Sequence, residues 1–198
     1  MVKNATIIFL FAIAILFHGC MGKNFEQMGN SLLVLEKTTV KEIKDSLGKP
    51  FVEQSLMKNN EKITYIVYYY MNEMGRGDGP NTVPKRSQTF YFSEGKLIGH
   101  FYSSSLKEDS TDFDKEKANE IKKGVSSEKD VLSIFGAPTG ESIYPLTDTK
   151  GDRIILYKYE KPVLKGSMIY SFDKSLKFVL DPNGIVKDIN YQEQKPDM

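Results

Sequence analysis

Cysteine, histidine and tryptophan are scarce in this sequence, whose 198 residues include one cysteine, two histidines and no tryptophan. The single cysteine, Cys20, cannot form an internal disulfide, and without a cluster of histidines and cysteines no zinc site is expected. His18 lies near the N-terminus, so His100 is the remaining candidate for a catalytic base, and no G-x-S-x-G turn presents a serine to it. P-loop and G-x-G-x-x-G motifs are also missing. These absences predict a protein that is not an enzyme and uses no cofactor or metal ion.

An excess of charge of one sign is missing as well. The chain has 27 lysines and arginines against 26 aspartates and glutamates, a formal net charge of +1. Nucleic-acid-binding proteins concentrate basic residues on one face, so this balance predicts no nucleic-acid partner. A hydrophobic content of 40% is enough for a folded core and excludes disorder as the state of the whole chain.

Apolar runs are short except at the N-terminus, where the eleven residues 7–17 are all apolar and follow Lys3. A stretch of this length is too short to cross a membrane comfortably, but it suits the core of a secretory signal peptide. We therefore predict that residues 1–19 are a signal peptide and that the chain is exported.

Cys20 follows the apolar run and a small residue, Gly19. This arrangement resembles the lipobox of bacterial lipoproteins, although Phe17 and His18 stand where the lipobox prefers leucine and a small residue. The resemblance implies that Cys20 is acylated and begins the mature chain; ordinary cleavage and an uncleaved anchor are the alternatives. Two or more acyl chains anchor a protein stably, so the membrane would be one partner. Met21 is not the aspartate that retains lipoproteins in the inner membrane, which implies an outer-membrane lipoprotein facing the periplasm.

Two similar twelve-residue segments, 39–50 and 127–138, lie 88 residues apart. In each, Thr39 or Ser127 can accept a hydrogen bond as the N-cap of a helix, and an acidic residue three positions later can return it. Apolar residues four apart follow, and Gly-x-Pro then suits a left-handed cap and the end of the helix. The chain is therefore predicted to contain two copies of one folding unit.

Strands are expected after each capped helix. Their ranges are 63–70, 88–92 and 96–102 in the first copy, and 153–159, 167–172, 176–180 and 185–191 in the second. A charged helix is also expected near 113–122. Two helices followed by antiparallel strands, twice over, predict an α+β fold with helices on one sheet face. The predicted parts are the signal peptide (1–19), a lipid-anchored tether (20–31), the first repeat (32–104), a linker (105–112), the second repeat (113–192) and a tail (193–198).

The repeated unit resembles the SmpA/OmlA (BamE-like) family of outer-membrane lipoproteins, and two copies in tandem are similar to the β-lactamase inhibitory protein. The likeness covers roughly residues 25–192. The residues that carry it are Ile43, Leu47, Gly48 and Pro50, matched by Val131, Phe135, Gly136 and Pro138. It implies a non-enzymatic, membrane-anchored module that binds a protein partner in outer-membrane protein assembly or envelope integrity. The alternatives are an inhibitor of a hydrolase such as a β-lactamase, and a structural envelope spacer.

Tyrosines gather in the predicted strand 63–70, whose sequence is ITYIVYYY. Alternation along a strand places Tyr65, Val67 and Tyr69 on one face. Helices cover only one face of a sheet, so Tyr65 and Tyr69 are candidate partner-binding residues, as exposed tyrosines often anchor interfaces. The alternative is that they pack between the two repeats.

A second candidate site is the segment 71–87, which has three glycines, two prolines and hardly any apolar periodicity. Loops of this length are usually functional or disordered. Its charged tip includes Arg76 and Asp78, which we predict to contact the partner; a flexible hairpin connection is the alternative.

Overall fold

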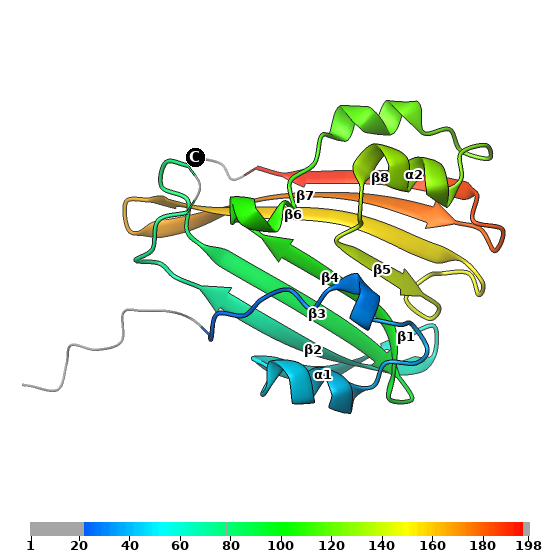
Figure 1. Ribbon diagram of the computed structural model, residues 1–198, viewed down its shortest axis with the longest axis horizontal. Helices are drawn as coiled ribbons and strands as arrows, with labels where there is room; N and C mark the ends of the chain where they lie inside the picture. The colour runs from blue at the N-terminus through cyan, green and yellow to red at the C-terminus, as the bar shows by residue number, and fades with distance from the viewer. Residues whose placement is uncertain (1–21, 78, 196–198) are drawn as a thin grey trace, which may run out of the picture.

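One antiparallel sheet of eight strands, in the order β1 to β8, organises the protein (Figure 1). The computed structural model describes residues 22–77 and 79–195, so the predicted signal peptide, Cys20 and Asp78 lie outside the described residues. The strands are β1 (Val52–Lys58), β2 (Glu61–Met71), β3 (Lys85–Ser93), β4 (Lys96–Ser104), β5 (Gly140–Ile143), β6 (Arg153–Lys165), β7 (Met168–Leu180) and β8 (Val186–Gln194). The helices are α1 (Val40–Leu47) and α2 (Glu128–Phe135), with the 3-10 turns η1 (Asn30–Leu32), η2 (Lys107–Asp109) and η3 (Lys115–Glu120).

The two α-helices begin where the sequence predicts. The Thr39 hydroxyl accepts a hydrogen bond from the backbone of Glu42, whose carboxylate accepts one from the Thr39 backbone N–H at 2.7 Å. Ser127 and Asp130 repeat this capping box, also with a 2.7 Å bond. These backbone bonds, and those from the two hydroxyls, lower the pKa of both carboxyls. The capped helices are thus confirmed in both halves.

Both helices pack on the same face of the sheet. Ile43 of α1 and Val131 of α2 are fully buried, each in its own apolar cluster. A row of directly opposed residues crosses five strands and joins the two clusters: Phe90, His100, Glu141, Ile155 and Phe178. Directly opposed residues share a face, so the cores lie side by side under one layer of helices (Figure 1).

Matching contacts relate the two halves. The Tyr68 hydroxyl donates to the carbonyl of Gly48 at 2.7 Å, and Tyr157 does the same to Gly136 at 2.8 Å. Phe25 lies 6.2 Å from the ring of Tyr68, and Phe113, 88 residues later, lies 6.3 Å from that of Tyr157. The first repeat therefore includes Phe25, although its predicted start is residue 32.

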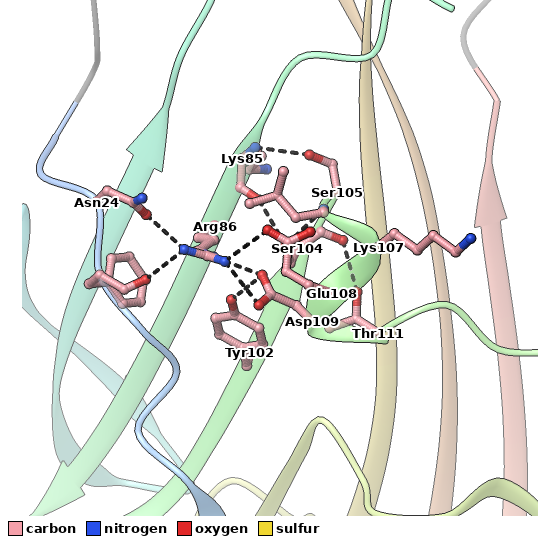
Figure 2. A network of polar contacts seen from close by, with 12 residues as sticks. Asn24, Lys85, Arg86, Tyr102, Ser104, Ser105, Lys107, Glu108, Asp109 and Thr111 are labelled. Atoms are coloured by element: carbon pink, nitrogen blue, oxygen red, sulfur yellow. Dashed lines mark hydrogen bonds and ion pairs between the residues drawn. The ribbon is translucent and has the colours of Figure 1, made fainter. Parts of the chain in front are cut away.

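The described part of the expected tether is packed against the sheet. Arg86 of β3 donates to Asn24 at 3.0 Å and to the carbonyl of Phe25 at 3.3 Å (Figure 2). Met28 is buried and exchanges two backbone hydrogen bonds with the Gln88 side chain, at 2.9 and 3.0 Å. The described part of the predicted tether is therefore packed on the fold, because Phe25 and Met28 supply side chains to the first apolar cluster.

The secondary structure also differs from the sequence prediction. The molecule is mostly β, because the expected charged helix near 113–122 is only the short 3-10 turn η3. Strands β1 and β5 are additional: β1 is polar and largely exposed, and β5 has four residues, so neither shows apolar alternation. The ranges 167–172 and 176–180 form one strand, β7, because it pairs with β6 along thirteen residue pairs.

The two halves share a continuous sheet through the pairing of β4 with β5. Gly140 permits this pairing, because a Cβ atom there would lie 2.3 Å from the carbonyl oxygen of His100. The end of the 71–87 segment is also held in place. Val83 is buried and donates to the carbonyl of Pro162 in β6 at 2.9 Å, while Leu164 donates to that of Asn81 at 2.8 Å. This part of the loop is therefore not a flexible connection.

Candidate protein-binding face

The sheet face opposite α1 and α2, here called the helix-free face, carries the candidate site. One row of directly opposed residues crosses the strands β2 to β6 on this face: Tyr65, Tyr91, Gly99, Ser142 and Ile154. The adjacent row contains Val67, Thr89, Phe101, Gly140 and Leu156. Most of these side chains are half-buried, as expected for a sheet face with no helix above it.

An aromatic row occupies the middle of the helix-free face. The ring centroids of Tyr65 and Tyr91 lie 6.0 Å apart, and those of Tyr91 and Phe101 lie 6.2 Å apart. Burial, and secondarily the nearby Tyr65 phenol, raises the pKa of Tyr91. The Tyr65 hydroxyl donates to the Gln54 side chain of β1 at 2.6 Å, which fixes its orientation. The rings of Tyr65, Tyr91 and Phe101 thus pack side by side, and part of their apolar surface stays exposed to solvent.

Tyr69 lies on the same face, toward the end of β2. Its ring is 5.5 Å from that of Phe51, and the Lys85 ammonium lies 5.5 Å from its centroid. Burial, followed by the negative charge of Glu160, raises the pKa of Tyr69. Tyr69 therefore connects the apolar part of the face to a charged cluster.

That charged cluster centres on Glu160 of β6. Its carboxylate accepts hydrogen bonds from Lys85 at 2.7 Å and from the Ser103 hydroxyl at 2.5 Å, and Lys158 lies 3.5 Å away. The side chains of Lys85 and Glu160 are each only 13% exposed. Burial by itself would raise the pKa of Glu160, but the charges of Lys85 and Lys158, with these hydrogen bonds, lower it to about 2. Glu160 is therefore ionised at every physiological pH.

Asp173 of β7 stands directly opposite Glu160. Burial, together with the neighbouring Glu160 carboxylate, raises its pKa. Its Oδ1 atom is buried and has no hydrogen-bond partner among the described residues. Asp173 thus adds a second carboxyl beside Glu160, with one buried oxygen that no described residue satisfies.

The structure places the predicted site residues in two regions. Tyr65 and Tyr69 share the helix-free face, whereas Arg76 is exposed in the loop after β2. Two residues after the predicted acylation site, Gly22 packs so closely on β2 that a Cβ atom would lie 1.9 Å from the carbonyl oxygen of Tyr69. His100, the candidate base, is 3% exposed and lies under the helices, so it does not face solvent.

Sequence reasoning missed most of the charged cluster and part of the aromatic row. The missed residues are Lys85, Tyr91, Phe101, Ser103, Glu160 and Asp173. One signal was present in β6, where the alternation of Ile154 and Leu156 continues into Lys158 and Glu160. Across the described residues, no three His, Cys, Asp or Glu side chains gather as a metal site requires. Within the same part of the chain, no helix has the length and apolar character needed to cross a bilayer.

The sequence matches no protein-family model, so membership of the SmpA/OmlA family stays a prediction, and it matches no curated protein. Among solved structures, the fold is similar to that of a Streptococcus mutans protein provisionally assigned as a beta-lactamase inhibitor protein, determined at 1.40 Å resolution. The TM-score is 0.46 and the sequence identity 16%, over 82% of this chain and 91% of that one. A likeness of this degree does not identify a partner or an activity.

Proposed function

We propose that this chain is a non-catalytic protein-binding module that contacts its partner through the helix-free face. The observation that carries the proposal is the aromatic row of Tyr65, Tyr91 and Phe101, which is half-buried in a sheet with no helix above it. Protein interfaces are enriched in tyrosine and phenylalanine at their centres, with polar groups around them. The cluster around Glu160 supplies such polar groups beside the row.

We also propose that acylated Cys20 holds the module at a bacterial envelope membrane, as an outer-membrane lipoprotein facing the periplasm. Gly22 packs on β2, and two residues of extended chain span at most roughly 7 Å. An anchored Cys20 would therefore hold the sheet against the membrane surface and give it little freedom to move away. This geometry supports a module that meets partners at the membrane, including the machinery of outer-membrane protein assembly.

Site-specific photocrosslinking tests the proposed face. A photoreactive amino acid replaces Tyr65 in the full-length chain, and the matched control replaces Val125, which is 71% exposed in the turn before α2. We expect a discrete crosslinked product in membranes from the Tyr65 position and none from Val125. Equal labelling from both positions, or none from Tyr65, would contradict the proposal.

Alanine substitutions measure the contribution of the two predicted tyrosines. We expect Tyr65→Ala and Tyr69→Ala each to weaken partner binding by about tenfold, the effect of a typical interface anchor. Leu32→Ala is the control, since Leu32 is 67% exposed on η1. Circular dichroism must show a folded chain in each case; unfolding by Tyr65→Ala or Tyr69→Ala would show that the residue serves the core instead.

The two alternatives from the sequence are separable by experiment. An inhibitor would suppress a hydrolase, so the full-length Cys20→Ser chain would be assayed against a panel that includes a β-lactamase; suppression would narrow the partner to that enzyme. A structural spacer needs no binding face, so it predicts unchanged envelope integrity after Tyr65→Ala or deletion of residues 76–80.

A further inference from the structure

The two strands at the edges of the sheet, β1 and β8, are the repeat counterparts of β5 and β4, the two strands whose pairing joins the halves. Strands β1 and β8 end the strand order, and no described strand pairs with their outer edges. At the start of β8, Val186 bonds to Gly124 and Ser126, so the free part of that edge begins after it. By the matching of the halves, β1 corresponds to β5, and β8 corresponds to β4. The outer edge of β1 is therefore equivalent to the edge of β5 that pairs with β4.

The join between β4 and β5 supplies a register for this comparison. There Gly99 is opposite Ser142, His100 opposite Glu141 and Phe101 opposite Gly140. Leu97 and Val186 are equivalent residues, because each donates to a corresponding carbonyl, that of Thr38 or Ser126, at 2.8 Å. The β8 equivalents of Gly99, His100 and Phe101 are consequently Asp188, Ile189 and Asn190.

The β1 residues that correspond to those of β5 lie 88 positions earlier in the sequence. Gly140, Glu141 and Ser142 correspond to Val52, Glu53 and Gln54. The two free edges would thus meet with Gln54 opposite Asp188 on the helix-free face. The Oε1 atom of Gln54 already accepts a hydrogen bond from the Tyr65 hydroxyl, so its amide N–H groups are left to donate. The Asp188 carboxylate pairs with Lys123 through Oδ1, and its second oxygen could accept from Gln54.

The outer edge of β1 has few of the features that prevent strand addition. Natural edge strands are commonly protected by charges, prolines or bulges. The pairing of β1 with β2 is regular from Val52 to Lys58, without a bulge, and β1 contains no proline. Exposed apolar side chains lie along it or beside it, including Phe51 (53% exposed) and Met57 (66% exposed). These features favour pairing with another strand.

We propose that β8 of one chain pairs antiparallel with β1 of a second copy, so that the sheet continues from molecule to molecule. The contact is head-to-tail, joining two different edges, and it leaves a free edge at each end of the pair. The helices of both copies stay on one face, as α1 and α2 do within the chain. The helix-free faces would then form one extended surface.

The contact between copies should be weaker than the internal join. Asn30 donates to the carbonyl of Pro138 across the internal join at 3.0 Å, whereas Ala118, its equivalent, has no side-chain donor. Val52 and Asp188 also carry side chains at the positions of Gly140 and Gly99, where the internal join has no room for one, so the backbones of β1 and β8 would have to shift apart locally at these residues. Self-association is therefore expected to be reversible and dependent on concentration.

Cysteine crosslinking tests the edges that meet. Gln54→Cys and Asp188→Cys are made separately in the full-length chain that also carries Cys20→Ser, so the introduced thiols are the only ones. Under mild oxidation in detergent, we expect dimers in the mixture of the two variants and not in either variant alone. Dimers from Gln54→Cys alone would indicate pairing of β1 with β1 and overturn the proposal, as would a mixture that stays monomeric.

A charge exchange provides a second readout that does not depend on thiols. Gln54→Glu would face Asp188 with a like charge and should weaken self-association roughly two- to fivefold in sedimentation velocity. Adding Asp188→Lys should restore it. Gln54 is exposed at the edge, so Gln54→Glu should not unfold the chain. Asp188→Lys removes the ion pair with Lys123, so thermal unfolding of that variant is measured beside its self-association. If Gln54→Glu leaves self-association unchanged, or Asp188→Lys fails to restore it, these residues do not face each other.

Discussion

At the scale of single residues, the chemistry of the helix-free face depends on the charges around Glu160. Lys85, Lys158 and Ser103 stabilise its ionised form, while Asp173 faces it with a second carboxyl. Three of these four neighbours come from other strands, and they are brought together only by strand pairing. The cluster therefore both stabilises the sheet and presents polar groups beside the aromatic row.

The carboxyl pair predicts opposite effects of two conservative substitutions. Glu160→Gln leaves the ammonium groups of Lys85 and Lys158 without their partner and should lower the free energy of unfolding by roughly 2–3 kcal/mol at pH 7. The negative charge of the Asp173 carboxylate repels that of Glu160. Asp173→Asn removes this repulsion, so it should raise the melting temperature at the same pH. Thermal unfolding of both variants beside the wild type measures the difference; the same direction of change in both would contradict this account.

The lowered pKa of Glu160 also predicts how stability depends on pH. Its pKa is about 2 in the folded protein against an ordinary value of 4.5, so the folded form holds the proton less tightly. The stabilisation is fully present above about pH 4.5 and is lost as the pH falls toward 2. Glu160→Gln should flatten this part of the stability curve.

At the scale of elements, the join between β4 and β5 determines whether the halves act as one sheet. It has only three residue pairs, and the close approach at Gly140 leaves no room for a side chain. The pairing of β5 with β6 has four residue pairs, whereas β6 and β7 pair along thirteen. The join is therefore the shortest contact between neighbouring strands in the described part of the chain, and Gly140 restricts it sterically.

Gly140→Ala should loosen this join while both apolar cores remain folded. We expect faster hydrogen exchange at β5 and a lower melting temperature, because the added methyl group would clash with the backbone of β4. Gly29→Ala is the matched control, since a Cβ atom there meets its first neighbour only at 4.0 Å. An equal effect of both substitutions would mean that the steric contact at Gly140 does not limit the join.

At the scale of the whole molecule, the segment that follows the proposed acylation site is part of the fold. Phe25 packs on the rings of Tyr68 and Tyr102, and Arg86 holds the neighbouring backbone while it pairs with Asp109 at 2.8 Å (Figure 2). If Cys20 is anchored as proposed, a force at the anchor would reach the sheet through this segment.

Phe25→Ala tests whether the segment belongs to the folded unit. Loss of a half-buried aromatic ring that packs on the core should lower the free energy of unfolding by roughly 2 kcal/mol, and Phe113→Ala, at the equivalent position, should have a similar effect. Chemical denaturation of the full-length chain measures both. No change with Phe25→Ala would support the original expectation of a free tether.

Much of the architecture could be predicted from the sequence because it depends on local chemistry. The capping residues and glycines at the two helices, the alternation in β2 and the 88-residue spacing each express a rule that holds within a few turns or one strand. They were sufficient for the capped helices, for the helix-free face and for the position of Tyr65 and Tyr69 on it. Strand β1 and the packed segment around Phe25 were missed because neither has apolar periodicity of its own.

The sequence by itself determined where each half begins its helix, which side of β2 faces the core and which residue is the candidate for acylation. Only the tertiary structure decided that the halves form one sheet, that Phe25 completes the first core and that Lys85, Ser103, Glu160 and Asp173 meet on one face. The physical reason is range: caps and alternation act between neighbours in the chain, whereas the pairing of successive strands brings together side chains such as Lys85 and Glu160, which lie 75 positions apart.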